Sequence, residues 1–160
     1  MFPTKILLAT NGTKEATFAE EAAVELANGT GSELHVVHVV STVPELPYPH
    51  TTARERSEAV LEMRRLRGLA LLDARVRRIE HGLGGSVAAS HYREGKPERE
   101  TVLLGEKLEA GLIVTGGTRR PWYERVFAGL GFSEHVSRKA GRPVLVAGEP
   151  KPRHHEPVRR

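Results

Sequence analysis

The 160-residue chain contains no cysteine, and this absence excludes several kinds of chemistry. Without a thiol the protein forms no disulfide, has no cysteine nucleophile and offers no thiolate to a metal ion. None of its eight histidines falls in a metal-binding spacing such as His-Glu-x-x-His. His35 and His38 lie an odd number of residues apart, so we expect them on opposite faces of one strand as hydrogen-bonded structural residues. We expect no metal centre and no catalytic residue.

Long apolar runs are missing as well. The first apolar run covers only residues 6–10, between Lys5 and Asn11, which is far too short for an export signal or a membrane span. Together with the lack of cysteine, this predicts a cytoplasmic protein without a membrane partner.

The formal net charge is only +4, and the basic excess gathers in residues 54–78 and 149–160. The second segment is rich in proline and nearly free of apolar side chains, so we expect a disordered tail after a single domain formed by residues 1–148. The first is rich in arginine, but acidic residues are interleaved with the arginines and no aromatic residue accompanies them. That pattern favours an ion-paired helix face over nucleic-acid binding.

Short apolar runs alternate along the chain with segments of helical periodicity. Strands are expected at residues 5–10, 33–40, 86–93, 112–114 and 144–146, and helices at residues 14–28, 54–81, 97–109 and 133–140. This order predicts a Rossmann-like α/β fold, with a five-stranded parallel sheet and helices on both faces. Ligands bind such sheets at the carboxyl ends of the strands.

Apolar spacing also predicts which helix faces are buried. Residues 14–28 carry a stripe of alanines that leaves Glu20 outside it, and Gly29 is expected to end this helix. The stripe of the next helix consists of Ala59, Met63, Leu66, Ala70, Val76 and Ile79.

The glycines after residues 112–114 mark a candidate anion site. The apolar run stops at Thr115, and Gly116 and Gly117 follow it, where the chain can turn tightly because glycine tolerates a positive φ. Backbone N–H groups near such glycines bind anions, so a phosphate group can be held here. The same glycines can equally serve only to turn the chain.

A helix N-terminus follows this glycine pair along the chain. Residues 133–140 have the pattern of a short helix, with Ser133 as the N-cap and Gly141 as the stop. Gly129 and Gly131 lie just before it. Because a helix N-terminus attracts anions, this helix can complete the same site.

Five stretches of the chain resemble the universal stress protein family, in the right order and at the right intervals. They are KILLATNGT, ELHVVHVV, EGKP, LIVTGG and SEHVSRKAGRPVLV, which together extend over residues 4–147. The resemblance implies a small α/β domain that usually forms a homodimer through its last strand, here Val144, Leu145 and Val146. It also implies that many members bind ATP or AMP and that few have catalytic activity.

The nucleotide-binding members carry Gly-x-x-Gly, nine residues, and then Gly-Ser or Gly-Thr, and this chain keeps that pattern only in part. Counted from Gly116, Arg119 replaces the second glycine, and Leu130 replaces the hydroxyl residue after Gly129. Counted back from the following helix, the corresponding residues are Gly117, Arg120, Leu130 and Gly131.

The resemblance also implies sugar and base contacts at the ends of the first two strands. The usual ribose aspartate is Asn11 here, directly after Ala9 and Thr10. A neutral amide still hydrogen-bonds a hydroxyl group, but without the strength of a carboxylate. The backbone contact to adenine falls at Val39.

Two functions remain open at this point. In the first, the protein binds ATP or AMP weakly, with phosphate contacts from Gly116, Gly117 and Gly129 and positive charge from Arg119 or Arg120. In the second, the dimer is itself an interaction module and the glycines only close the fold. An enzyme is the weakest alternative, because the only acidic residue between positions 112 and 130 is Glu124.

Overall fold

A single parallel sheet forms the centre of the molecule. The computed structural model describes residues 1–42, 58–117 and 131–149. Within them, five strands pair in the order β3-β2-β1-β4-β5. The strands are β1 (Lys5–Ala9), β2 (Glu33–Ser41), β3 (Val87–Gly95), β4 (Leu112–Gly116) and β5 (Val144–Ala147). The predicted five-stranded parallel sheet is confirmed.

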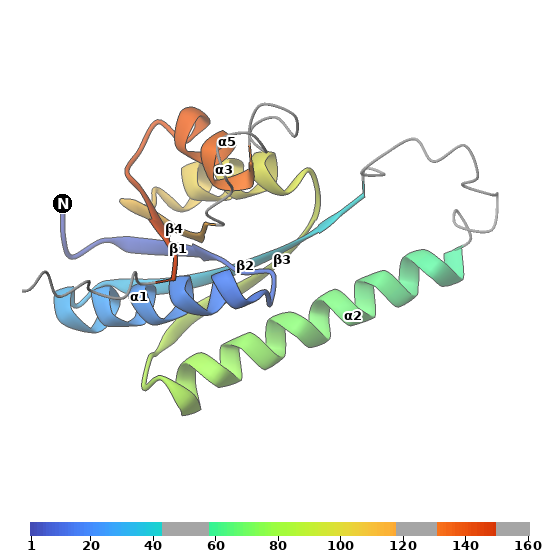
Figure 1. The fold of residues 1–160 in the computed structure, drawn as a ribbon, viewed down its shortest axis with the longest axis horizontal. Coiled ribbons are helices and arrows are strands. Elements are labelled where there is room, and N and C mark those ends of the chain that lie inside the picture. Colours follow the sequence, from blue (N-terminus) through green and yellow to red (C-terminus); the bar gives the residue numbers. More distant parts are fainter. Residues whose placement is uncertain (43–57, 118–130, 150–160) are drawn as a thin grey trace, which may run out of the picture.

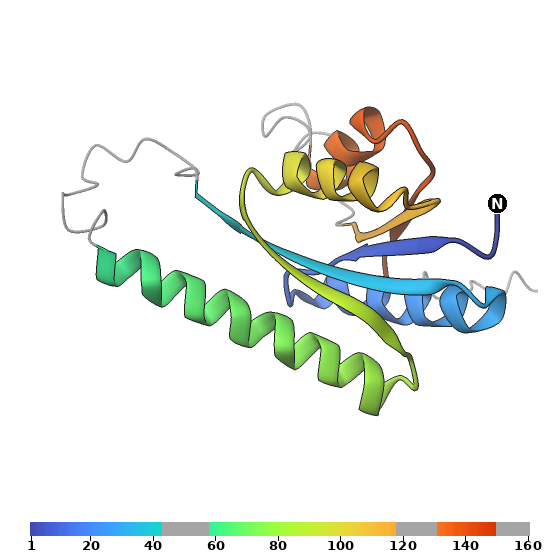
Figure 2. The same cartoon turned by 180° about the vertical axis from the view of Figure 1, so that it is seen from behind.

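Helices cover both faces of this sheet, as the sequence predicted (Figure 1). One face is covered by α1 (Lys14–Thr30) and α2 (Glu58–Arg77). A π-helical turn (Arg78–Gly82) extends α2 at its carboxyl end. The other face is covered by α3 (Pro97–Leu108) and α5 (Phe132–Lys139), and the view from behind shows the same layers (Figure 2). No helix in the described part of the chain is apolar over the length that a bilayer requires.

The central strand shows why the sheet needs two covering layers. Ile6 and Leu8 are fully buried in the cluster beneath α1 and α2, whereas Leu7 and Ala9 belong to the cluster beneath α3 and α5. Because successive side chains of a strand point to opposite faces, a run that is apolar at every position belongs inside such a sandwich.

Several element ends differ from the prediction. α1 does not end at Gly29 but continues to Thr30, and Gly31 closes it with a φ of 67° and an N–H donated to Ala27. β3 runs on to residue 95, past its expected end at residue 93. The cap of α5 is Gly131 and not Ser133, which lies inside the helix. Local patterns set such ends only to within a few residues.

The prediction for the buried face of α2 is wrong. The structure buries Gly68 and Leu72 of this helix, while Met63 and Leu66 are 53% and 57% exposed. Ile79, the last member of the expected stripe, is buried, but it belongs to the π-helical turn. The helix therefore shows its most regular apolar stripe to solvent.

Glu20 contradicts the prediction for α1. It lies inside the buried alanine stripe, with no exposed surface at all. Position 20 is four residues after Ala16 and three before Ala23, so helical geometry places it on the same face. The small alanines leave room there for the side chain of Arg78, which reaches Glu20 from the π-helical turn.

The expected tail lies almost wholly outside the described residues. Its first residue, Glu149, forms an exposed ion pair with Lys14 at the start of α1, with 3.1 Å between Oε1 and Nζ. Exposed pairs of this kind contribute little to the free energy of unfolding.

Candidate functional site

The carboxyl ends of the three central strands meet where the strand order reverses. β2 and β3 lie on one side of β1, and β4 and β5 lie on the other. Ala9 at the end of β1 is paired with Val37 of β2 and with Thr115 of β4. Sheets of this class leave a ligand crevice at such a point. The structure therefore brings the residues expected at the ends of β1, β2 and β4 to one edge of the sheet.

A tight turn joins β1 to α1, and the Asn11 side chain closes it. The Oδ1 atom of Asn11 accepts hydrogen bonds from the backbone N–H of Thr13 (3.1 Å) and from its hydroxyl group (2.7 Å). Gly12 has a φ of 75°, a conformation that favours glycine. Thr13 then caps α1 by accepting the N–H of Ala16. Because its oxygen is engaged, the Asn11 side chain has only the N–H donors of its amide to offer a ligand.

Thr10 anchors this turn from below. Its hydroxyl group donates to Oε1 of the buried Glu20 (2.8 Å), and its backbone N–H donates to the carbonyl of Val37 (3.0 Å). The other oxygen of Glu20 accepts from Arg78 (2.7 Å), with Arg75 at 3.8 Å. The Thr10 hydroxyl group is therefore committed to the protein interior, and its role is structural.

Val39 presents backbone groups at the edge of the crevice. The last residue of β2 that pairs with β1 is Val37, and its carbonyl faces β1 because it accepts the N–H of Thr10. Backbone groups alternate in direction along a strand, so the N–H and C=O of Val39 point to the same side. They lie beyond the end of β1, where the resemblance to the family implies an adenine contact.

Gly116 and Gly117 are glycines for a different reason from the one expected. Neither has a positive φ, and Gly116 is the last residue of β4. A Cβ atom on Gly116 would lie 2.7 Å from the backbone carbonyl of Glu15 in α1. A Cβ atom on Gly117 would overlap the side chain of Val146 in β5. Both glycines let the end of β4 pack closely against its neighbours, and neither uses the positive φ that glycine tolerates.

Gly131 caps α5, and its backbone is extended (φ −70°, ψ 168°) with no side-chain cap. An N-terminus without a side-chain cap is suited to an anion. The remaining expected site residues, Arg119, Gly129 and Leu130, lie outside the described residues, as do Arg120 and Glu124.

Sequence reasoning missed the support beneath the site. The Asn11-Gly12 pair is a turn signal, and Thr13 before a helical run is an N-cap signal, so both were present in the sequence. The spacing of Glu20 from the buried alanines was another signal. Nothing in the sequence indicated that Arg75 and Arg78 would reach Glu20, because they lie more than fifty residues away.

A hydrogen-bonded row of Glu33, His35 and His91 crosses β2 and β3 on the face beneath α3. Nε2 of His35 lies 3.4 Å from Oε2 of Glu33, and Nδ1 lies 3.2 Å from Nε2 of His91. The imidazole planes of His35 and His91 are 16° apart, and the ring centroids are 5.5 Å apart. A centroid distance of this size is expected when the two nitrogens lie on the line between the ring centres, because it is close to the N–N distance plus the radii of both rings. The nitrogens therefore face each other in line, and this contact is an N–H···N hydrogen bond and not a face-to-face stack.

For neutral histidines, the contact with Glu33 assigns the donors and acceptors of the row. Nε2–H of His35 donates to Glu33, which leaves Nδ1 as the acceptor for Nε2–H of His91. His38 lies on the opposite face, where Nδ1 donates to the carbonyl of Thr10 (2.9 Å). The prediction of two structural histidines on opposite faces is confirmed. The described residues contain no group of three histidine or acidic side chains placed to hold a metal ion.

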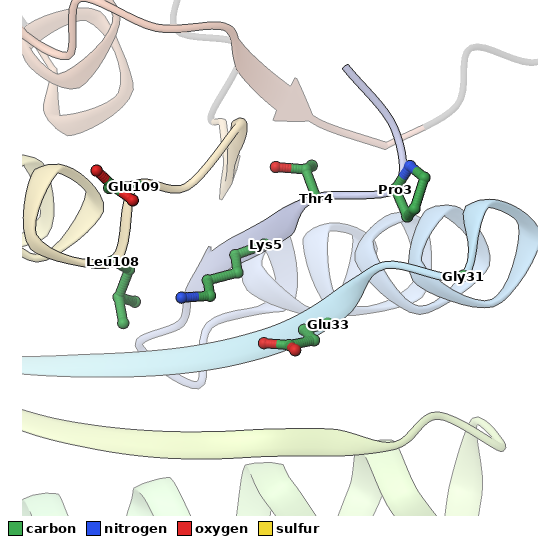
Figure 3. A pocket seen from close by; sticks show the side chains of 7 residues that line it. All are labelled: Pro3, Thr4, Lys5, Gly31, Glu33, Leu108 and Glu109. Atoms are coloured by element: carbon green, nitrogen blue, oxygen red, sulfur yellow. The ribbon is translucent and has the colours of Figure 1, made fainter.

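A shallow pocket lies at the opposite end of the sheet (Figure 3). Lys5 and Glu33, which begin β1 and β2, line it together with Leu108 and Glu109 at the end of α3. Parallel sheets bind ligands at the carboxyl ends of their strands, and this pocket is at the amino ends. We therefore place the candidate site at the edge formed by Asn11, Val39 and Gly116.

Comparison with known proteins identifies the relatives of the chain. The model of the universal stress protein family matches residues 3–148. A universal stress protein of Methanocaldococcus jannaschii is 30% identical over 147 residues, which cover 92% of this chain and 83% of the relative.

Two solved structures have the same fold. The universal stress protein UspA of Lactobacillus plantarum superposes with a TM-score of 0.69 at 19% identity, covering 92% of this chain and 99% of the other. A universal stress protein in complex with cAMP superposes with a TM-score of 0.68 at 18% identity, covering 91% and 97%. At these identities the likeness concerns the fold.

Proposed function

Because the chain belongs to the universal stress protein family, we propose that it is a regulatory protein of the stress response that binds an adenine nucleotide weakly. The ligand is ATP or AMP, held at the carboxyl edge of the sheet. The protein acts in the cytoplasm, requires no cofactor and does not hydrolyse the nucleotide. Nucleic acid and membranes are not its partners.

The observation that carries this proposal is the backbone of Val39. Its N–H and C=O lie beyond the end of β1, as argued from the direction of the Val37 carbonyl. An adenine ring offers both donors and acceptors on its edge, so an exposed N–H and C=O pair on a strand can recognise it. The structural neighbour in complex with cAMP supports an adenine nucleotide as the ligand class.

The remaining contacts explain why the binding is weak. Asn11 offers only neutral amide donors to a ribose hydroxyl group. At Leu130 the family's hydroxyl donor is replaced by an apolar side chain, and a lost hydrogen bond to a charged group costs about 1.5 to 3 kcal/mol. Arg119 adds positive charge that recovers part of this loss. We expect a dissociation constant of tens of micromolar or more, which corresponds to a binding free energy on the order of −6 kcal/mol.

Isothermal calorimetry with ATP and AMP tests the proposal. The variant Asn11→Asp keeps an oxygen that accepts from Thr13 and adds a negative charge at the ribose, so it should bind about three to ten times more tightly. Glu33→Gln, at the far end of the sheet, is the matched control and should not change the affinity. If millimolar nucleotide produces neither heat nor a shift in melting temperature, the nucleotide proposal is wrong.

The homodimeric interaction module is the second candidate function, and the packing of Gly116 favours it. Close contact with α1 accounts for this glycine without any ligand. β5 is also an edge strand whose Leu145 and Val146 are 37% and 43% exposed. Apolar edge strands associate readily, and an isologous pair of β5 strands would cover them. We propose this dimer under either function.

A further inference from the structure

The outer face of α2 carries a row of exposed apolar side chains. Ala59, Met63, Leu66 and Ala70 follow one another at intervals of four, three and four residues, and all four are exposed. This spacing places them in one stripe along the helix. Figures 1 and 2 show α2 as an outer layer with the rest of the molecule on one side only. We call these four residues the α2 stripe.

The packing of α2 keeps this stripe turned outward. At Gly68 the helix touches the sheet so closely that a Cβ atom would lie 2.6 Å from Val40 and 2.8 Å from Tyr92. Leu72, four residues later, is also buried. Gly68 is two residues after Leu66, so the two point in nearly opposite directions around the helix. The helix cannot bury the stripe without losing its contact with β2 and β3.

We propose that the α2 stripe pairs with the same stripe of a second copy, as a short parallel coiled coil. The intervals match two heptads, with Met63 and Ala70 at the a positions and Ala59 and Leu66 at the d positions. The next two seam positions are Asp73 and Arg77, which form an ion pair with each other (2.7 Å). The apolar seam therefore ends there.

The charges beside the stripe select the second copy and the parallel direction. Glu62 lies at a g position and Arg67 at the following e position, both exposed. In a parallel pair, g of one helix meets the following e of the other, so Glu62 lies beside Arg67 of the second copy on both sides of the seam. In an antiparallel pair, Glu62 would meet Leu69 and Arg67 would meet Val60, and no opposite charges would meet.

The pairing is weak and distinct from the dimer proposed through β5. Two heptads bury far less than the roughly 1,200 Å² of a stable interface, so the contact depends on protein concentration. α2 packs against β2 and β3, and β5 is the edge strand on the other side of the sheet. Both contacts can therefore exist in one assembly, and changes in the α2 stripe leave the β5 edge intact.

The absence of cysteine makes disulfide trapping a direct test. Leu66→Cys places one thiol at a d position, where the two copies approach closely enough for a disulfide. Under mild oxidation it should form a covalent dimer at least ten times faster than Arg64→Cys, an exposed control off the seam. Glu62→Lys should slow the reaction of Leu66→Cys, and adding Arg67→Glu should restore it.

Three results would overturn the proposal. Equal rates for Leu66→Cys and Arg64→Cys would show random collision. Faster trapping between Met63→Cys and Leu66→Cys in a mixture than between two Leu66→Cys chains would show an antiparallel pair. A Leu66→Cys thiol that a small alkylating reagent cannot reach in the monomer would show that the stripe is covered by the chain itself. An unchanged melting temperature confirms that each variant is folded.

Discussion

At the scale of single residues, Gly116 shows how a binding motif and a packing requirement coincide at one position. The backbone of α1 requires a glycine here, because a Cβ atom on residue 116 would lie 2.7 Å from it. A substitution here therefore disturbs the fold before it reports on any ligand. Loss of nucleotide binding in Gly116→Ala would not by itself identify a phosphate contact.

We predict that Gly116→Ala lowers the free energy of unfolding by about 1 to 3 kcal/mol, the usual cost of overpacking. Urea denaturation measures it. Gly131→Ala is the matched control, because no atom of the described residues lies within 4 Å of its Cβ position and its φ is −70°. Equal stability of Gly116→Ala and the wild type would show that α1 and β4 are not packed as described.

Glu20 is the second residue with a large predicted effect. Glu20→Ala removes the carboxylate that accepts hydrogen bonds from Thr10 and Arg78 in the core. We expect the free energy of unfolding to fall by about 3 kcal/mol, which is the low end for breaking a buried ion pair. The loss stays at this low end because Arg75 and Arg78 are partly exposed and can still be hydrated. Glu20→Gln keeps an acceptor for Thr10 and should cost less. A loss below 1 kcal/mol for Glu20→Ala, measured by denaturant titration, would contradict this ordering.

At the scale of elements, the strands were predictable and the faces of α2 were not. Residues 6–9 and 112–114 are apolar at every position, which is typical of strands buried on both sides, and the structure confirms both strands. In α2 the helical period of the apolar residues was predicted correctly, but the residues of this apolar stripe are not the residues that the helix buries. Gly68 decides the face through its contact with Tyr92, and a glycine contributes nothing to an apolar pattern.

The pairing of β2 with the edge strand β3 should depend on pH through His91. Burial lowers the pKa of His91 below 6.5, and the electrostatic influence of the neighbouring His35, Arg93 and Lys107 side chains lowers it further. As the pH falls, His91 is therefore protonated in the unfolded chain at a higher pH than in the folded protein. The stability contributed by neutral His91 is present above about pH 6.5 and is lost as the pH falls through the lower pKa of the folded state.

Melting temperatures between pH 7.5 and pH 5 test this dependence. The wild type should lose stability over this interval, and His91→Gln should lose less, because it keeps a donor toward His35 and cannot take up a proton. His81→Gln, at an exposed histidine of the π-helical turn, is the control. If His91→Gln shows the same slope as the wild type, His91 does not contribute to the dependence.

At the scale of the whole molecule, the sequence predicted the edge of the sheet that carries the candidate site but not the structural support of this site. Val39 and Gly116 lie near the carboxyl ends of their strands and Asn11 lies just after β1, and such strand ends in an α/β fold share one edge. The resemblance to the family assigned roles to them, and the structure brings them together there. Thr10 is different, because its role depends on Glu20 and Arg78, which come from other elements.

The proposed homodimer through β5 gives a prediction at this scale. Val144 is half-buried in the cluster beneath α5, so a lysine there would damage the core. Leu145 and Val146 are exposed, and the double variant Leu145→Lys, Val146→Lys should abolish the β5 dimer without unfolding the chain. Light scattering at micromolar concentration should show the wild type as a dimer and this variant as a monomer. A wild-type monomer would contradict the prediction.

The central claim is that an adenine nucleotide binds where the carboxyl ends of β1, β2 and β4 meet. A titration of the isotope-labelled protein with AMP, followed through its backbone amide resonances, tests that location directly. We predict that the largest shifts occur at Asn11, Val39 and Gly116. Shifts centred on Lys5 and Glu33 at the other end of the sheet, or no shifts at millimolar AMP, would contradict the claim.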